Sequence, residues 1–127
     1  MKKILLLVIS FLITSTINAQ EPTNRVYAEL LGTQSNVLGL NKNCKVTIDL
    51  GQFQSTFKDY KLQDENGKDI KFNSMVDAMN YMGKRGWKFV QAYFVTIGKQ
   101  HVYHWLLYKD VKSDDEIFEG LKIKHND

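Results

Sequence analysis

Apolar and polar residues alternate along two stretches of the chain, and a period of two is typical of half-buried β-strands. Between Cys44 and Leu50 the alternation has no interruption. Residues 25–32 alternate less strictly, with Val26 and Leu30 on the side that would face a core. These two stretches predict two strands, each with one buried face and one polar face.

A helical period replaces this alternation between residues 75 and 85. On a helical wheel, one side collects the small and apolar residues, which are Met75, Val76, Ala78, Met79, Met82 and Gly83. Ser74 followed by Asp77 resembles the capping box that begins a helix. Gly86 suits the left-handed position that ends one. We therefore expect an amphipathic helix whose methionines fill a core.

Two hairpins are predicted, one on each side of this helix. The first turns through residues 65–67, and a three-residue loop there pairs Leu62 with Ile70, so that apolar residues face each other. The second joins residues 87–97 to residues 101–109 through a two-residue turn that begins with glycine. Both hairpins extend the predicted antiparallel sheet.

The second hairpin has apolar residues on both faces. Its two-residue turn sets Phe89 opposite Tyr108 and Phe94 opposite Tyr103, and it places Trp105 on the other face from Phe89. A single helix covers only one face of such a sheet. The second face therefore needs a cover, for which the candidates are residues 113–121, the region 33–57 and a partner protein.

Together these elements predict an α+β fold, in which an antiparallel sheet of about four to six strands carries one main helix (about 75–85) on one face. Ser113 followed by Glu116 resembles a second capping box and predicts a short C-terminal helix. Beyond Lys122 we expect a polar, frayed tail. The predicted organisation is a signal peptide over 1–19, an α+β domain over 20–112 and a helical or flexible tail over 113–127.

Residues 1–19 have the three parts of a secretory signal peptide. Lys2 and Lys3 form the basic start, residues 4–17 are mostly apolar, and Ala19 is a small residue at the expected cleavage position. The apolar stretch is shorter than the roughly 18–20 residues that a transmembrane helix needs, which makes an uncleaved anchor the less favoured alternative. We expect cleavage near Ala19, with no membrane span afterwards. Cleavage just before Gln20 resembles that of secreted proteins of certain Gram-negative bacteria, and this resemblance implies a secreted or periplasmic protein of such a bacterium.

Removal of this signal changes the charge of the protein. The full chain of 127 residues has a formal net charge of +3, and without Lys2 and Lys3 it has 15 basic and 14 acidic residues. Proteins that bind nucleic acid concentrate their basic residues in a patch, whereas the signs here are interspersed. The sequence therefore predicts no nucleic-acid partner. A single Cys also excludes an internal disulfide and an all-cysteine zinc site.

Gly86-Trp87 ends the predicted helix, and the run Leu-Leu-Tyr-Lys at 106–109 closes the following hairpin. In these motifs, residues 72–110 resemble a small bacterial domain family of unknown function. The turn at 64–68 is also similar to one in uncharacterised secreted bacterial proteins. The resemblance implies an α+β fold with a helix across an antiparallel sheet, and it brings no catalytic residues. The region 33–57 and the signal peptide depart from the family pattern.

No catalytic or cofactor-binding motif stands out in the chain. His101 and His104 would point to opposite faces of a strand, which prevents them from binding one metal ion together. Cys44 belongs to the apolar side of its strand and is interpreted as a core residue. We assign no catalytic residue, no cofactor and no metal, and the sequence leaves open whether the protein is an enzyme.

The remaining candidate is a binding surface made by Phe94, His101, Tyr103 and Trp105. The leading hypothesis is a secreted, non-catalytic interaction module that binds a protein partner, or itself as a homo-oligomer, through this apolar sheet face. The alternative is a periplasmic or surface glycan-binding module in which Trp105 stacks on sugar rings. A third hypothesis is a small hydrolase that uses His101 or His104.

Overall fold

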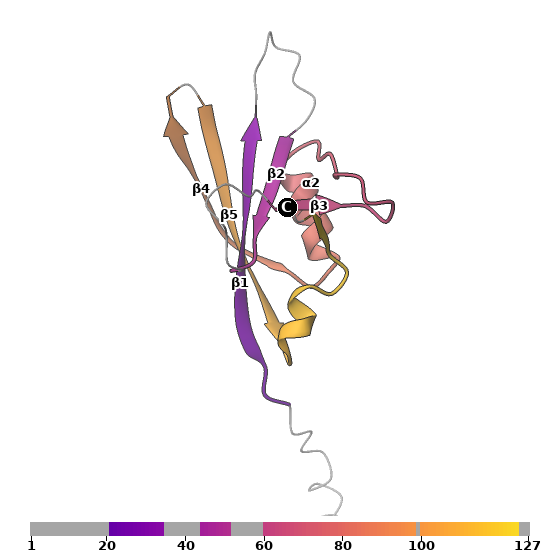
Figure 1. The fold of residues 1–127 in the computed structure, drawn as a ribbon. Coiled ribbons are helices and arrows are strands. Elements are labelled where there is room, and N and C mark those ends of the chain that lie inside the picture. Colours follow the sequence, from indigo (N-terminus) through magenta and orange to yellow (C-terminus); the bar gives the residue numbers. More distant parts are fainter. Residues whose placement is uncertain (1–20, 35–43, 52–59, 99, 125–127) are drawn as a thin grey trace, which may run out of the picture.

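The computed structural model describes residues 21–34, 44–51, 60–98 and 100–124. An antiparallel sheet in the order β2-β1-β5-β4 dominates the fold (Figure 1). Its strands are β1 (Asn24–Gln34), β2 (Cys44–Asp49), β4 (Lys88–Ile97) and β5 (Gln100–Val111). A second sheet pairs β3 (Lys61–Gln63) with β6 (Lys122–Lys124), and the helices are α2 (Met75–Gly83) and the 3₁₀ helix η2 (Asp114–Ile117). The predicted antiparallel sheet and main helix are thus confirmed.

Strands β1 and β2 bury alternate residues, as the sequence pattern predicts. In β2 the residues from Cys44 to Ile48 alternate between buried and less buried. Leu30 on β1 lies opposite Ile48 on β2, and Ala28 on β1 lies opposite Leu107 on β5. We call the face that carries Leu30, Ile48 and Leu107 the core face, and the opposite one the far face.

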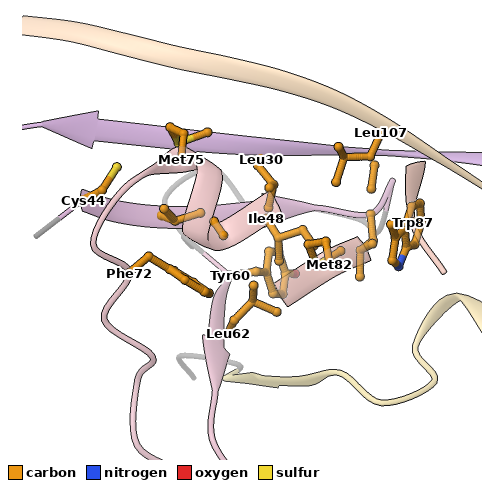
Figure 2. Packing of buried hydrophobic residues seen from close by; sticks show 14 residues of the cluster. Leu30, Cys44, Ile48, Tyr60, Leu62, Phe72, Met75, Met82, Trp87 and Leu107 are labelled. Carbon is orange, nitrogen blue, oxygen red and sulfur yellow. The ribbon is translucent and has the colours of Figure 1, made fainter. Parts of the chain in front are cut away.

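One hydrophobic cluster joins the helix to the core face (Figure 2). Met75, Ala78 and Met82 are buried on α2 and belong to the same cluster as Leu30 and Leu107. Figure 1 shows α2, β3 and η2 on one side of the large sheet. The methionines therefore fill a core, as expected. Val76 is 57% exposed, so its assignment to the apolar side of the helix is wrong.

Both ends of α2 are capped where the sequence predicts. The Ser74 hydroxyl accepts a hydrogen bond from the Asp77 backbone N–H at 3.1 Å. The Asp77 carboxylate accepts from the N–H of Asn73, at 3.0 Å, so this is a variant of the capping box. Gly86 has φ 87°, and the N–H of Trp87 bonds back to the Met82 carbonyl at 3.3 Å. This left-handed ending carries the chain from the helix directly into β4.

The first hairpin has the predicted register but is very short. The Ile70 N–H donates to the Leu62 carbonyl at 2.8 Å, and Gly67 has φ 76°. On the side of Leu62 and Ile70 away from the turn, the two halves of the hairpin separate. There Phe72 forms an antiparallel β-bridge with Cys44 of β2 instead. The regular partner of β3 is β6, which the sequence placed in a frayed tail. That expectation began beyond Lys122, and it is wrong for Ile123 and Lys124.

The second hairpin follows the predicted register from Gln91 to its turn and departs from it only before Gln91. Phe94 lies opposite Tyr103, as predicted, but Phe89 lies opposite Leu107 instead of Tyr108. A β-bulge between Phe89 and Gln91 causes this shift, because it adds one residue to β4. The bulge turns Phe89 to the core face. The prediction that Trp105 lies on the other face from Phe89 is therefore wrong.

The C-terminal segment lies on the helix side of the sheet. The predicted short helix is the 3₁₀ helix η2, and Ser113 makes no side-chain cap hydrogen bond there. Ile117 and Leu121 pack against the core cluster, and the Lys109 ammonium, on the core face, donates to the Glu116 carbonyl at 2.7 Å. Residues 113–121 therefore leave the far face uncovered. Much of the other candidate cover, 33–57, lies outside the described residues.

Candidate functional site

The exposed large hydrophobic side chains of the described residues gather on β4. Nine such side chains are exposed, and six of them lie on this strand. They are Phe89, Val90, Tyr93, Phe94, Val95 and Ile97. All ten residues of β4 are exposed, and β4 is an edge strand of the large sheet. Because the hydrophobic effect favours burying such a surface, its concentration on one strand makes β4 the candidate binding region.

The four residues that the sequence selected lie together on the core face of this hairpin. The Phe94 ring lies edge-on to His101, with centroids 5.8 Å apart, and tilted toward Tyr103 at 6.5 Å. Trp105 is next along the same face of β5 and is half-buried. Phe94 itself is 63% exposed. We call these four residues, together with Phe89, the aromatic patch.

Phe89 is the member of the aromatic patch that the sequence analysis missed. Its ring meets Trp105 edge-on, with centroids 5.4 Å apart. An unbroken strand would direct Phe89 to the far face, and only the bulge at Val90 brings the two rings together. No pattern in the sequence marks this bulge. Phe89 makes the patch wider toward the base of the hairpin.

A hollow of about 260 Å³ separates the aromatic patch from the start of α2. Its lining residues are Cys44, Ser74, Met75, Val76, Tyr103 and Trp105. Burial raises the pKa of the Cys44 thiol, which keeps it protonated and weakly nucleophilic. The hollow is therefore a place for an apolar group, and Cys44 acts there as a small core residue, as interpreted from the sequence.

The far face of the same hairpin carries a polar cluster around Glu29. The Tyr93 hydroxyl donates to the Glu29 carboxylate at 2.8 Å, and the Tyr93 ring stacks on His104 with centroids 4.8 Å apart. His104 Nδ1 lies 3.2 Å from the same carboxylate oxygen, but without the alignment of a hydrogen bond. This cluster needs the pairing of β1 with β5, so the sequence alone did not indicate it.

The hydrogen bond to Glu29 raises the pKa of the Tyr93 phenol, and burial and the negative charge act in the same direction. Because the pKa of Tyr93 is higher in the folded state than in the unfolded chain, its contact with Glu29 stabilises the fold. This stabilisation is fully present at pH values below the pKa of the unfolded chain, and it is lost as the pH rises through the pKa of the folded protein. In a Glu29→Gln variant, we expect the pKa of Tyr93 to fall toward the ordinary value of 10.0.

Alkaline titration of tyrosinate absorbance measures this shift, with the Tyr93→Phe variant identifying the contribution of Tyr93. Glu119→Gln, which removes a carboxylate on the C-terminal segment, is the matched control. Identical titration curves for the wild type and Glu29→Gln would show that Tyr93 does not depend on this carboxylate.

The two histidines point to opposite faces, as predicted. His101 contacts Phe94 on the core face and Thr96 Oγ1 at 3.0 Å, whereas His104 stacks on Tyr93 on the far face. Among the described residues, no group of three or more His, Cys, Asp or Glu side chains is placed to hold a metal ion. The histidines are therefore parts of two separate surfaces.

No known protein family, curated protein or solved structure matches the chain. The resemblance of residues 72–110 to a bacterial domain family stays a prediction. Within the part of the chain that the structure describes, no helix combines the length and the apolar character needed to cross a bilayer.

Proposed function

We propose that this protein is an exported, non-catalytic interaction module that binds a protein through the aromatic patch. The observation that carries the proposal is the exposure of large hydrophobic residues along β4, of which Phe89 and Phe94 belong to the aromatic patch. Protein interfaces are enriched in aromatic residues at their centres and depleted of charge there. Between Phe89 and Ile97, β4 has no charged residue, and the facing part of β5 from Gln100 to Tyr108 has none apart from its histidines.

The arrangement of the fold supports this role. We infer that α2 packs over only part of the core face, while the β4–β5 hairpin extends away from it (Figure 1). The buried helix residues share a cluster with Leu30 and Ile48 rather than with Phe94. The hairpin thus presents aromatic side chains on a hydrogen-bonded strand pair, and a backbone that is already ordered loses less conformational entropy on binding.

A glycan-binding module has less support from the geometry. Sugar rings stack on open, flat aromatic faces, but Trp105 is half-buried and meets Phe89 edge-on. The rings of Phe94 and Tyr103 are inclined at 51° and offer no common plane. A shift of Trp fluorescence on adding cell-wall saccharides, lost in Trp105→Phe, would revive this alternative.

Photo-crosslinking in the exporting bacterium tests the proposed function. A benzoylphenylalanine residue in place of Phe94 is expected to give a discrete protein adduct on illumination, with another copy of the chain counted among the partners. The same residue in place of Phe118 is the matched control, because Phe118 is also an exposed Phe but lies at the end of η2, away from the aromatic patch. Fractionation of the same cells reports whether the protein leaves the cytoplasm.

An adduct at position 94 and none at position 118 is the expected result. Equal labelling at both positions, or no discrete adduct at position 94, would contradict a specific protein-binding surface. Retention of the protein in the cytoplasm would contradict export, which rests on the signal-like residues 1–19.

A further inference from the structure

Among the described residues no strand pairs with the outer edge of β4, and this open edge offers backbone groups as well as side chains. Residues that flank a two-residue turn form a hydrogen-bonded pair, and such pairs alternate along antiparallel strands. Ile97 flanks the turn, so Ile97 and Val95 direct their backbone N–H and C=O groups toward β5. By the same alternation Ala92, Phe94 and Thr96 direct theirs to the open edge. An added strand would find three consecutive bonding positions there.

These three positions are symmetric about Phe94. In an antiparallel pairing of β4 with a second β4, a two-fold axis at Phe94 sets Phe94 opposite itself and Ala92 opposite Thr96. Each of these pairs exchanges two backbone hydrogen bonds. The bulge between Phe89 and Gln91 interrupts the edge at one end, and the turn at Gly98 ends it at the other. The regular segment between them, 91–97, has Phe94 at its centre.

The charge pattern favours a second copy over a different protein. Segment 91–97 has no charged residue, and Lys88 lies outside it. A self-pairing therefore brings no like charges together, whereas edge strands that avoid pairing commonly carry inward or central lysines. Phe94, at 63% exposure, is the most exposed aromatic side chain of the described residues and would meet its own copy at the axis.

We propose that two copies of this chain pair through the edges of their β4 strands, antiparallel and with Phe94 on the two-fold axis. The pairing extends each four-stranded sheet into one continuous sheet and joins the two aromatic patches across the axis. The inference rests on the proposed function and names its partner, a second copy. It also gives the interface a defined register.

Opposite charges at position 94 test this register. The wild-type protein, purified from cells that express the full chain, is expected to sediment as a dimer at micromolar concentration. Phe94→Lys and Phe94→Glu, each alone, should raise the dissociation constant by about 100-fold, because each places like charges opposite each other. An equimolar mixture of the two variants should again form a dimer, since Lys then faces Glu.

Phe118→Lys is the control, because it makes the same substitution at an exposed Phe that lies at the end of η2, outside the aromatic patch, and should leave the dimer intact. Far-ultraviolet circular dichroism verifies that every variant is folded. A monomeric wild type, a dimer that persists in Phe94→Lys, or a mixture that stays monomeric would overturn the proposal. A monomer that still gives a discrete adduct with another protein at position 94 would overturn self-pairing and leave the proposed function standing.

Discussion

Replacing Trp87 with alanine is expected to lower the free energy of unfolding by about 3–5 kcal/mol. Trp87 is 2% exposed and is the largest fully buried side chain of the described residues. It follows Gly86 at the end of α2 and packs in the same cluster as Met82 and Leu107 (Figure 2). Its removal would open a cavity where the helix, β4 and β5 meet. Because a domain of this size is stable by roughly 5–15 kcal/mol, this loss is a large part of the total free energy of unfolding.

Trp105→Ala is the matched comparison, since it removes the same side chain from the half-buried edge of the cluster. We expect it to cost about 1–2 kcal/mol. Urea unfolding followed by circular dichroism measures both variants, because the signal does not depend on either tryptophan's fluorescence. Equal losses would mean that Trp105 is as much a part of the core as Trp87. The aromatic patch would then be smaller than described.

Local patterns predicted the elements whose determinants lie within a few residues of each other. Ser74 and Gly86 mark the ends of α2 because capping depends on side chains and φ angles at those positions. The pair of Phe94 with Tyr103 follows from a two-residue turn only a few positions away. The alternation between Cys44 and Leu50 indicates its buried face directly.

The elements that the sequence analysis placed wrongly, or did not predict, depend on contacts between distant parts of the chain. Phe89 reaches the core face through a bulge that no local residue type requires, and it is stabilised there by Trp105 from the other strand. Strand β6 has three residues and forms only because β3, far away in sequence, offers it an edge. Glu29 joins Tyr93 and His104 through the pairing of β1 with β5. Such pairings have no signature in a single sequence.

The candidate site was likewise predicted in one respect and misplaced in another. Phe94, His101, Tyr103 and Trp105 do lie on one face, as their spacing predicts. The sequence analysis placed Trp105 on the other face from Phe89, but the pairing of β5 with β1 sets Trp105 opposite Leu30 on the core face, and the bulge brings Phe89 to the same face. A one-residue change of register moves a side chain to the other face. The composition of the site could therefore be predicted, but its position relative to α2 could not.

Gly32→Ala is expected to lower the free energy of unfolding by about 1–3 kcal/mol. Gly32 is buried on the core face of β1, where a Cβ atom would overlap the Met75 sulfur and approach the Cys44 sulfur to 3.2 Å. The missing side chain is what lets the first turn of α2 approach the sheet. Met75 is itself buried, so it cannot swing into solvent without losing its own packing. Urea unfolding of the variant measures the cost.

A second substitution identifies the cause of that cost. In a Met75→Ala background the overlapping sulfur is gone, so Gly32→Ala should cost less by about 0.5–3 kcal/mol, the usual range for residues in contact. Gly83→Ala is the control, because nothing lies within 4 Å of its added Cβ atom, and alanine there should be neutral or stabilise α2 by up to about 1 kcal/mol. If Gly32→Ala cost the same with and without Met75, the helix would not rest on β1 at this point. The hollow beside Tyr103 and Trp105, which Met75 lines, would then have a different wall, and the boundary of the aromatic patch would move with it.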